Sequence, residues 1–402
     1  MRFAELLLAI GAARADAPAP PELHESGLES GLRLVVAPQA GGAGDGAVAA
    51  VLVLPFGWTD DRAQSGRGFA ALLADYVTFE GEVGATWSAD LEPERLCFHG
   101  TFARETLAEA LSTLARRLTA DAVEETRFSQ VGEAWRAPTP ASTDRFREAA
   151  WPTTRLGRRP RGAAEERAPT REEFQRFLGE RCGCEGAVLV VAGAAPTAQC
   201  ELAASRAFAG FPRARGVAPR EPIEPYPARP RRTAAPTGAS EALIGFRTAW
   251  RDDPAGDGLA LARAFLAQLA GGREALFERT RQGALMAFRA GDEAGAARLR
   301  EAFAARIEAL AAGRPLSGGE LAAALDRLDG ELAEAAASPA GLARLLADGA
   351  SMHEDPLAAF GRRRRLEAAG AEAAGAALRG LLPPRGLIEV SAWFPRPAPE
   401  GS

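Results

Sequence analysis

Few residues in this chain of 402 could carry metal, nucleophilic or acid–base chemistry. The candidate ligands and nucleophiles are three histidines and four cysteines, namely His24, His99, His353, Cys97, Cys182, Cys184 and Cys200. A closed zinc site built on Cys182, Cys184 and Cys200 would take its fourth ligand from Cys97 or His99. Because the Cys182-Gly-Cys184 pair lacks C-x-x-C spacing, we expect no metal there. The even count leaves both free thiols and a disulfide from the pair to Cys200 or Cys97 open.

The composition excludes several other kinds of site. All 48 basic residues are arginines, so the chain has no G-x-x-x-x-G-K-[ST] phosphate loop, no Schiff-base lysine and no Ser-x-x-Lys nucleophile. No G-x-S-x-G elbow occurs either. A net charge of −5 provides no basic footprint for nucleic acid. No apolar run approaches the roughly 20 residues of a membrane-spanning helix.

One predicted helix has no good metal ligand on the face where two residues lie four positions apart. GFAALLADYVTFEG, residues 68–81, predicts a helix that runs into a turn. Leu72 and Tyr76 lie four positions apart and share one face of that helix, with Asp75 beside Tyr76. Leucine cannot bind a metal and neutral tyrosine is a poor ligand, so this face is typical of a helix packed on a core. Asp75 is the candidate for a residual base.

These positions need a supporting frame, and the flanking sequence predicts a sheet with helices. Apolar runs typical of strands occur at 31–38, 47–57, 95–102 and 186–193. Residues 104–118 have helical spacing, and residues 170–182 open with Thr170 and Glu173 in a capping-box pattern. In the second half of the chain, Ala- and Leu-rich helices precede a closing strand at 387–394.

A long repeat divides the chain into two similar halves. VLVLPFGWTDD begins at Val51, and ALIGFRTAWRDD begins at Ala242. In each copy an apolar strand runs into a Trp-x-Asp-Asp turn and then a helix, and Trp58 and Trp250 lie 192 positions apart. A period of this length indicates a duplicated domain. We therefore predict an α+β fold of two tandem duplicated mixed α/β domains, each a sheet with helices packed on one face.

The expected organisation has four parts. An N-terminal domain covers 22–212, a Pro/Arg-rich extended linker covers 213–237, and a C-terminal domain covers 238–397. Residues 1–17 contain one arginine, a short apolar run and Ala-Arg-Ala, which resembles a secretory signal peptide. The expected location is the periplasm or the medium, or the cytoplasm if the leader is not cleaved. A plain N-terminal helix is the alternative.

Taken in order, SGLRLVVAPQ, GWTDDRAQSGRGFAALLADYVTFEG, TREEFQRFLGERC and GGREALFERTRQGA resemble the pitrilysin, insulinase and mitochondrial processing peptidase family. Active members carry H-x-x-E-H, in which two histidines on one helical face bind zinc and the glutamate polarises the bound water. Aligned on Phe79 and Gly81, this motif falls on Leu72, Asp75 and Tyr76. The resemblance implies half of a clamshell with a degenerate motif, and no metal or cofactor bound by this chain.

The resemblance places the other family positions as well. The downstream glutamate ligand falls in VEETRFSQVGEAW, at Glu133 or else at Glu125. Active pairs use an arginine and a tyrosine of the second domain to hold the substrate carbonyl, and Arg281 stands at the arginine position. A solvated or ion-paired Arg281 is the alternative. The tyrosine is absent from GALM at 283–286, which implies a lost hairpin, and GGREALFERTRQGA is expected to open a helix.

Two functions of different classes follow from the resemblance. The first is a catalytically inactive subunit of an insulinase-type zinc metallopeptidase. It would form a heterodimer with a zinc-bearing homologous partner and hold peptide substrates by adding them to a sheet edge. Any hydrolase activity would then come from the partner. The alternative is a structural or assembly protein with the same frame, as in respiratory-complex core proteins. An enzyme of unrelated chemistry has little support, because nucleophile and cofactor signals are few.

Overall fold

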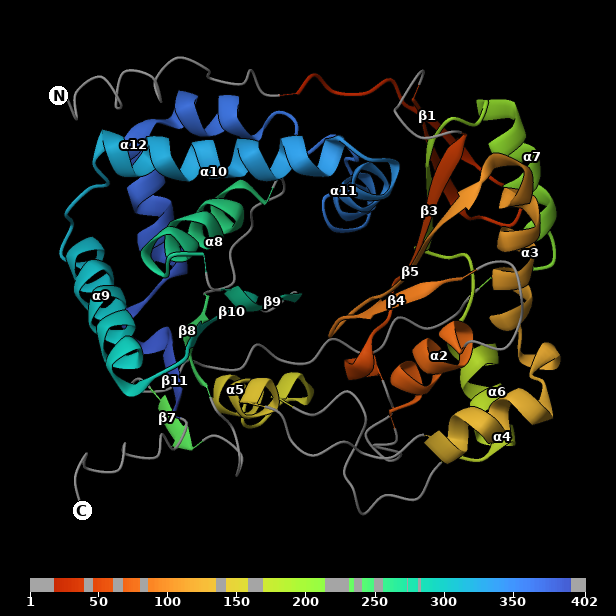
Figure 1. Ribbon diagram of the computed structural model, residues 1–402, viewed down its shortest axis with the longest axis horizontal. Helices are drawn as coiled ribbons and strands as arrows, with labels where there is room; N and C mark the ends of the chain where they lie inside the picture. The colour runs from red at the N-terminus through yellow and green to blue at the C-terminus, as the bar shows by residue number, and fades with distance from the viewer. Residues whose placement is uncertain are drawn as a thin grey trace, which may run out of the picture.

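Two β-sheets, each with its own layer of helices, form the frame of the molecule (Figure 1). The first sheet comes from the N-terminal half of the chain and the second from the C-terminal half. The computed structural model describes residues 18–39, 46–60, 68–79, 86–134, 142–157, 169–213, 231–234, 241–248, 256–272, 274–280 and 283–391. The predicted α+β architecture is confirmed.

The first sheet has the strand order β1-β2-β6-β3-β5-β4. Its strands are β1 (His24–Gly27), β2 (Arg33–Pro38), β3 (Ala47–Leu54), β4 (Ser88–Leu91), β5 (Leu96–Ala103) and β6 (Val188–Gly193). β2 and β6 pair in parallel, and every other neighbouring pair is antiparallel. β6 is buried at each position, as its uninterrupted apolar sequence predicts for a strand covered on both faces.

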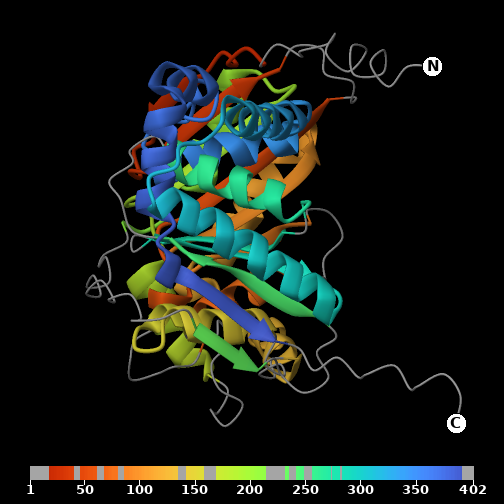
Figure 2. The same cartoon turned by 90° about the vertical axis from the view of Figure 1, so that its left-hand side faces the viewer.

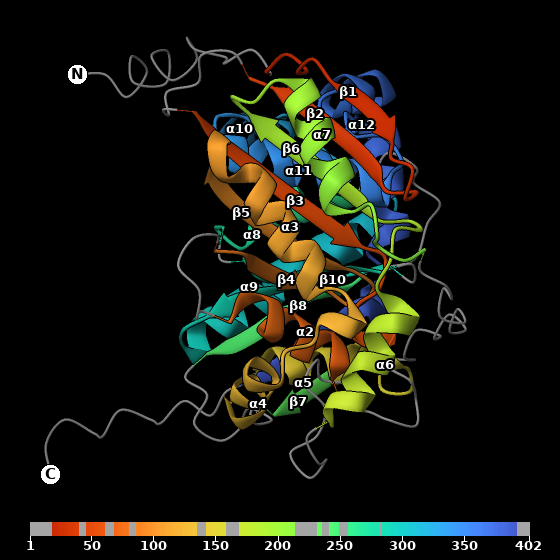
Figure 3. The ribbon, with the colours of Figure 1, turned by 90° about the vertical axis from the view of Figure 1, so that its right-hand side faces the viewer.

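Among the described residues, five helices of the N-terminal half cover one face of this sheet (Figure 3). They are α2 (Phe69–Thr78), α3 (Leu107–Arg117), α4 (Glu125–Ala134), α6 (Arg171–Arg181) and α7 (Thr197–Ala207). Their apolar side chains and those of the strands form one core. The predicted capping box at α6 is present. The Thr170 side chain accepts from the Glu173 amide, and Glu173 Oε2 accepts from the Thr170 amide at 2.9 Å.

The second sheet has the strand order β7-β11-β8-β10-β9. Its strands are β7 (Arg231–Ala234), β8 (Ala242–Arg247), β9 (Glu274–Thr280), β10 (Gly283–Ala290) and β11 (Leu387–Ser391). In the described part of the second half, four helices cover one face of it, seen from their own side of the molecule in Figure 2: α8 (Asp257–Leu269), α9 (Glu293–Ala311), α10 (Gly318–Ala336) and α12 (Arg362–Leu381). Phe246, Phe265 and Phe303 are fully buried in their common core.

The two sheets repeat one topology, which confirms the predicted duplication. The order β2-β6-β3-β5-β4 returns as β7-β11-β8-β10-β9, with the parallel pair in the same place. The helix after the central strand follows a left-handed glycine in both copies, Gly68 and Gly256, each with φ of 65°. A side chain would strain either position. These glycines are 188 positions apart, so the connection before the helix is four residues shorter in the second copy than the 192-residue repeat predicts. Trp250 lies outside the described residues.

The remaining face of each sheet is covered by a helix from the opposite half. α11 (Pro339–Met352) places Leu346 in one cluster with Val51 and Val190 of the first sheet. α5 (Ser142–Ala150) places Phe146 in one cluster with Leu285 of the second sheet. Both helices lie between the two sheets in Figure 1. Through this exchange, which has no local signal in the sequence, each half completes the core of the other.

One expectation about the second half is wrong. GGREALFERTRQGA was expected to open a helix, but residues 274–280 form strand β9. Phe277 pairs with Met286 and Glu278 with Leu285 in an antiparallel ladder with β10. Here tertiary pairing outweighs the helix preference of Glu, Ala, Leu and Arg. The β9–β10 hairpin holds the same place as β4–β5, so the expected loss of a hairpin is wrong too.

Several predictions concern segments outside the described residues. Residues 1–17, most of the linker 213–237, and Arg281 are among them. The domain limits 22–212 and 238–397 therefore stay predictions. Within the part of the chain that the structure describes, no helix combines the length and the apolar character that crossing a membrane requires.

Candidate functional site

Helix α2 carries the three positions that the sequence analysis singled out. It packs beside β4, the edge strand of the first sheet. Leu72 and Tyr76 share the inner face, as their spacing predicts, and each is only 1% exposed. Asp75, one position before Tyr76, is half-buried. The side chains of Leu72 and Tyr76 therefore lie in the core of the first domain. A pair of metal ligands at these positions would instead have to face an open site.

Tyr76 is held by packing and by a hydrogen bond. Its ring meets the ring of Phe174 at 5.4 Å between centroids. The backbone amide of Glu124 donates to the Tyr76 hydroxyl at 3.0 Å. Burial raises the pKa of the Tyr76 phenol above its ordinary value, so this side chain is neutral at physiological pH. A neutral, buried phenol that already accepts a hydrogen bond is a poor metal ligand.

Helix α4 carries the two glutamates proposed as the downstream ligand. Glu133 is exposed, and Glu125 forms an ion pair with Arg171 at 3.3 Å. The α4 residues buried toward the core are instead Arg127, Phe128 and Val131. The structure thus brings an arginine and two apolar side chains, and neither glutamate, to the buried face of α4, which packs against α2.

Two arginines bind the last carbonyl oxygens of α2. Arg127 donates from Nε to the Tyr76 carbonyl at 2.7 Å and from Nη2 to the Phe79 carbonyl at 2.5 Å. Arg117 donates from Nη1 to the Val77 carbonyl at 2.8 Å. These bonds satisfy orphan acceptors of the helix and place positive charge at the negative end of its dipole. The Arg127 guanidinium also lies 5.5 Å from the Tyr76 ring centroid, and its positive charge would repel a metal ion bound there.

The donor set at α2 does not fit zinc. A protein zinc site takes three or four nitrogen, sulfur or oxygen donors. Among the described residues, no group of three or more His, Cys, Asp or Glu side chains is placed to hold a metal ion. What surrounds Leu72 and Tyr76 is an apolar core with arginine caps. This arrangement stabilises a helix end and offers no activated water.

The histidines and cysteines that opened the sequence analysis are dispersed in the structure. His99 Nε2 lies 3.2 Å from Asp90 Oδ2 and 2.6 Å from Arg344 Nη2, on the face of the first sheet toward α11. His24 pairs with Glu201 at 2.9 Å. All four cysteines are free thiols, so the disulfide alternative is not realised in the structure.

A charged cluster that the sequence did not predict lies between the two halves. Asp348 of α11 binds Arg95 Nη1 of the first domain at 2.7 Å and also binds Arg279 of β9. Burial alone would raise the pKa of Asp348, but the charges of Arg279 and Arg95 hold it well below its ordinary value. Asp348 was visible only as a charge inside the apolar run LARLLADGA. Its partners are distant in sequence, so no local pattern reveals them.

Two pockets flank this cluster, and both are lined in part by Leu345 and Asp348. One has a volume of about 310 Å³ beside β4 and β5, with His99 and Arg344 in its wall. The other, of about 160 Å³, lies beside β9. Neither of these two pockets is lined by a residue of α2.

Comparison with known proteins gives the fold a context. No family model and no curated protein sequence matches the chain. A protease from Helicobacter pylori matches over 93% of this chain and 100% of its own, with a TM-score of 0.74 and 14% identity. A peptidase M16 inactive domain from Pseudomonas fluorescens matches over 92% and 97%, with a TM-score of 0.73 and 15% identity.

A chain of Complex III2 from Candida albicans has a similar likeness. It matches over 92% of this chain and 96% of its own, with a TM-score of 0.72 and 14% identity. At such identities the likeness establishes the fold. The fold, the half-clamshell that the sequence predicted, also occurs in that protease and in that peptidase M16 inactive domain.

Proposed function

We propose that this protein is a catalytically inactive subunit of an insulinase-type zinc metallopeptidase. One observation carries the proposal. The two positions that align with the zinc-binding histidines, Leu72 and Tyr76, are 1% exposed in a packed core. Arginine caps and the ring of Phe174 fill their surroundings. Catalysis by this frame needs a metal-activated water, and such a core supplies none.

Retention of the whole frame supports a role in binding. Both sheets end at a strand, β4 or β9, with no further strand on its outer side among the described residues. Such edges can accept an extended peptide through main-chain hydrogen bonds. We infer that a zinc-bearing homologous subunit supplies the chemistry and that this chain helps to hold the peptide. Arg281 is a candidate substrate contact.

We place the mature chain in the periplasm or outside the cell, because residues 1–17 have the composition of a signal peptide. Intact-mass measurement on protein from the periplasmic fraction tests this placement. The expected product lacks about the first 17 residues. A full-length chain in the cytoplasmic fraction contradicts the placement, and it leaves the subunit role unaffected.

Coexpression tests the subunit role. The chain, of 42.1 kDa, is produced with a homologue from the same genome that carries H-x-x-E-H, and each is also produced alone as a control. Light scattering is expected to show a one-to-one complex, with zinc and peptidase activity in the complex and none in this chain alone. If both proteins stay monomeric when mixed at micromolar concentration, the subunit role is wrong.

The likeness to a chain of Complex III2 favours a second candidate, a structural or assembly protein with the same frame. This candidate predicts a different partner. Affinity purification of the chain from its native cells would then recover a large assembly without peptidase activity. The two candidates are separated by whether the recovered partner carries H-x-x-E-H.

A further inference from the structure

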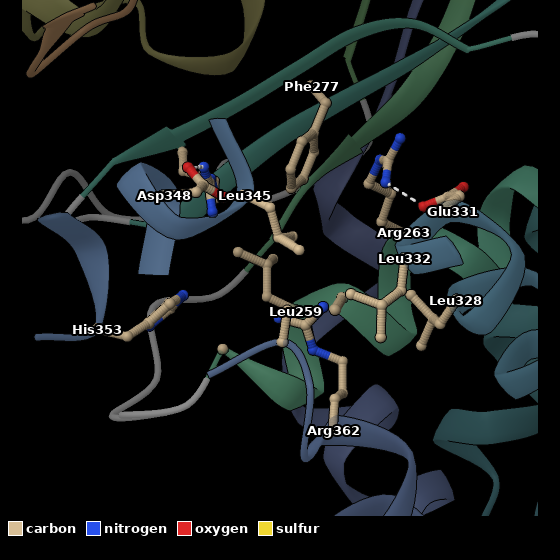
Figure 4. Close-up of a pocket in the computed structure, with 14 residues that line it drawn as sticks. Leu259, Arg263, Phe277, Leu328, Glu331, Leu332, Leu345, Asp348, His353 and Arg362 are labelled. Atoms are coloured by element: carbon tan, nitrogen blue, oxygen red, sulfur yellow. Dashed lines mark hydrogen bonds and ion pairs between the residues drawn. The ribbon is translucent and has the colours of Figure 1, made fainter. Parts of the chain in front are cut away.

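A pocket of about 160 Å³ lies where helices α8, α10 and α11 meet strand β9 (Figure 4). Its wall is largely apolar, made by Leu259, Phe277, Leu328, Leu332 and Leu345. Figure 4 shows the Phe277 ring projecting from β9 toward Leu345 and Leu259. The pocket lies in the second domain, away from the positions on α2 discussed above.

The charged residues at the rim are neutralised by partners. Arg263 binds Glu274 and Glu331, each at 2.8 Å. Arg362 lies 3.4 Å from Asp257, and Arg279 binds Asp348. Because each of these arginines already faces a carboxylate, an anionic ligand would gain little charge attraction from them. The chemistry of the pocket therefore favours an uncharged, apolar group.

The volume indicates the size of that group. A cavity of about 150 Å³ lined by Leu, Ile and Phe accommodates a benzene ring. The pocket is about as large and has the same kind of wall, including an aromatic ring that offers edge or offset contacts. A phenyl side chain fits such a space, whereas a charged side chain would lose hydration on entering it.

The position beside β9 indicates how such a side chain arrives. Phe277 and Arg279 both line the pocket, so the alternate residues of this strand face it. β9 is an edge strand among the described residues, and it pairs with β10 on its inner side. A residue of an added strand that lies opposite Phe277 or Arg279 points to the same face of the sheet. Its side chain would therefore enter the pocket.

From these observations we propose that the pocket is a specificity site for an aromatic side chain of an extended peptide, which pairs through its backbone with the outer edge of β9. This inference rests on the proposed role in peptide binding and adds what that role lacks, a substrate class. The peptide is recognised by an aromatic side chain, and the recognition requires no metal.

Peptide binding measured by fluorescence anisotropy tests the proposal on the full chain. The probe is a labelled Thr-Ser-Thr-Ser-Phe-Ser-Thr-Ser-Thr peptide, and its counterpart has Ala in place of Phe. Wild-type protein is expected to bind the Phe probe about tenfold or more tightly than the Ala probe, because the phenyl group leaves water. A third probe has Pro at the two residues on each side of Phe, which removes N–H donors on both edges of the peptide strand. It is expected to lose binding, since Pro cannot donate to β9.

Two substitutions locate the binding. Ala260 is half-buried in the pocket wall, so Ala260→Phe fills the space and is expected to abolish the preference for Phe over Ala. Ala376→Phe makes the same change at an exposed position of α12 and is expected to preserve it. Leu259→Ala enlarges the pocket and is expected to shift the preference from Phe toward a Trp probe. Because this variant removes volume instead of adding it, a folding defect in Ala260→Phe does not block the test.

Equal affinity for the Phe and Ala probes, or absent binding of both, overturns the proposal. A preference that survives Ala260→Phe and is not shifted by Leu259→Ala also overturns it. These outcomes are independent of the subunit role, which is judged from the mass and zinc content of the complex. A stable complex without aromatic preference rejects only the pocket, and aromatic preference in a chain that never pairs rejects only the subunit role.

Discussion

Arg147 of α5 and Glu278 of β9 form a buried ion pair between segments 131 positions apart, with Nη2 2.5 Å from Oε1. The side chains are 11% and 7% exposed. Burial raises the pKa of Glu278, and the charge of Arg147 offsets part of that effect. The Arg147 guanidinium also lies 5.2 Å from the centroid of the Trp58 ring. The pair thus joins a helix of the first half to the edge strand of the second.

Arg147→Met is expected to reduce the free energy of unfolding by about 3–5 kcal/mol, because it leaves the Glu278 carboxylate buried without its partner. The loss should shrink as the pH is lowered and Glu278 becomes neutral. Urea melts at several pH values measure both effects. Arg145→Met, which breaks the more exposed Arg145–Glu148 pair, is the control and should cost less than about 1 kcal/mol. Equal losses in the two variants would contradict this expectation.

Asp348→Asn is expected to cost about 1–3 kcal/mol at pH 7, because Arg95 and Arg279 lose a charged acceptor. The pKa of Asp348 is lowered in the folded state from an ordinary 3.8. Its contribution is therefore complete above that value and is lost as the pH falls below it. Wild type and variant should converge in acid. The exposed Asp121→Asn serves as the control, and a difference between wild type and Asp348→Asn that grows on acidification would show that the sign is wrong.

The purified chain is expected to contain well below one zinc per molecule and to cleave no peptide, because leucine and a buried phenol hold the two ligand positions. Metal analysis after dialysis against excess zinc and removal of free metal is the measurement. About one zinc per chain, lost on Asp75→Ala, would refute the assignment of these positions.

Restoring the motif by Leu72→His, Asp75→Glu and Tyr76→His together is not expected to yield a peptidase. Two imidazoles in this core would lack partners, at a cost of about 3–5 kcal/mol. Asp75→Glu alone is the control and should cost less than about 1 kcal/mol. Thermal melts and a peptidase assay with added zinc decide the matter. Robust turnover by the triple variant alone would mean that this chain still has second-domain residues that can hold the substrate carbonyl.

The four thiols are expected to react slowly in the native protein. Burial raises the pKa of Cys97 to about 12 and that of Cys200 to about 11, and it also raises those of Cys182 and Cys184. Little thiolate is therefore present at pH 8. Labelling with a thiol reagent should be at least about 100-fold slower in buffer than in denaturant, where four groups react. Fewer than four groups in denaturant would reveal a disulfide.

The sequence predicted those parts of the fold whose signals are local. The run GAVLVVAG predicted β6, and the Thr170–Glu173 pair predicted the start of α6. The shared turn in the two halves predicted the duplication. Each of these depends on neighbouring residues or on direct repetition, which a single chain displays.

Features that depend on distant partners were not predictable in this way. Residues 274–280 have helix-favouring composition and became a strand because β10 pairs with them. Nothing in the residue spacing of α5 or α11 tells which sheet each helix covers. At the candidate site, the sequence identified Leu72 and Tyr76 as core residues, but the caps by Arg127 and Arg117 come from other helices and had no local signal.

The exchange of α5 and α11 also determines when, during synthesis, the first sheet can be covered. α11 begins 146 positions after β6 ends, so one face of the first sheet has no cover until most of the chain has been made. At roughly 5–20 residues per second, a ribosome needs roughly 7–30 s to reach it. During that interval the nascent chain presents a Val- and Ala-rich face to its surroundings, and a chaperone or rapid export is what could shield it. The first half of the chain is thus the part at risk of aggregation during synthesis. The risk ends when α11 of the second half packs on the first sheet.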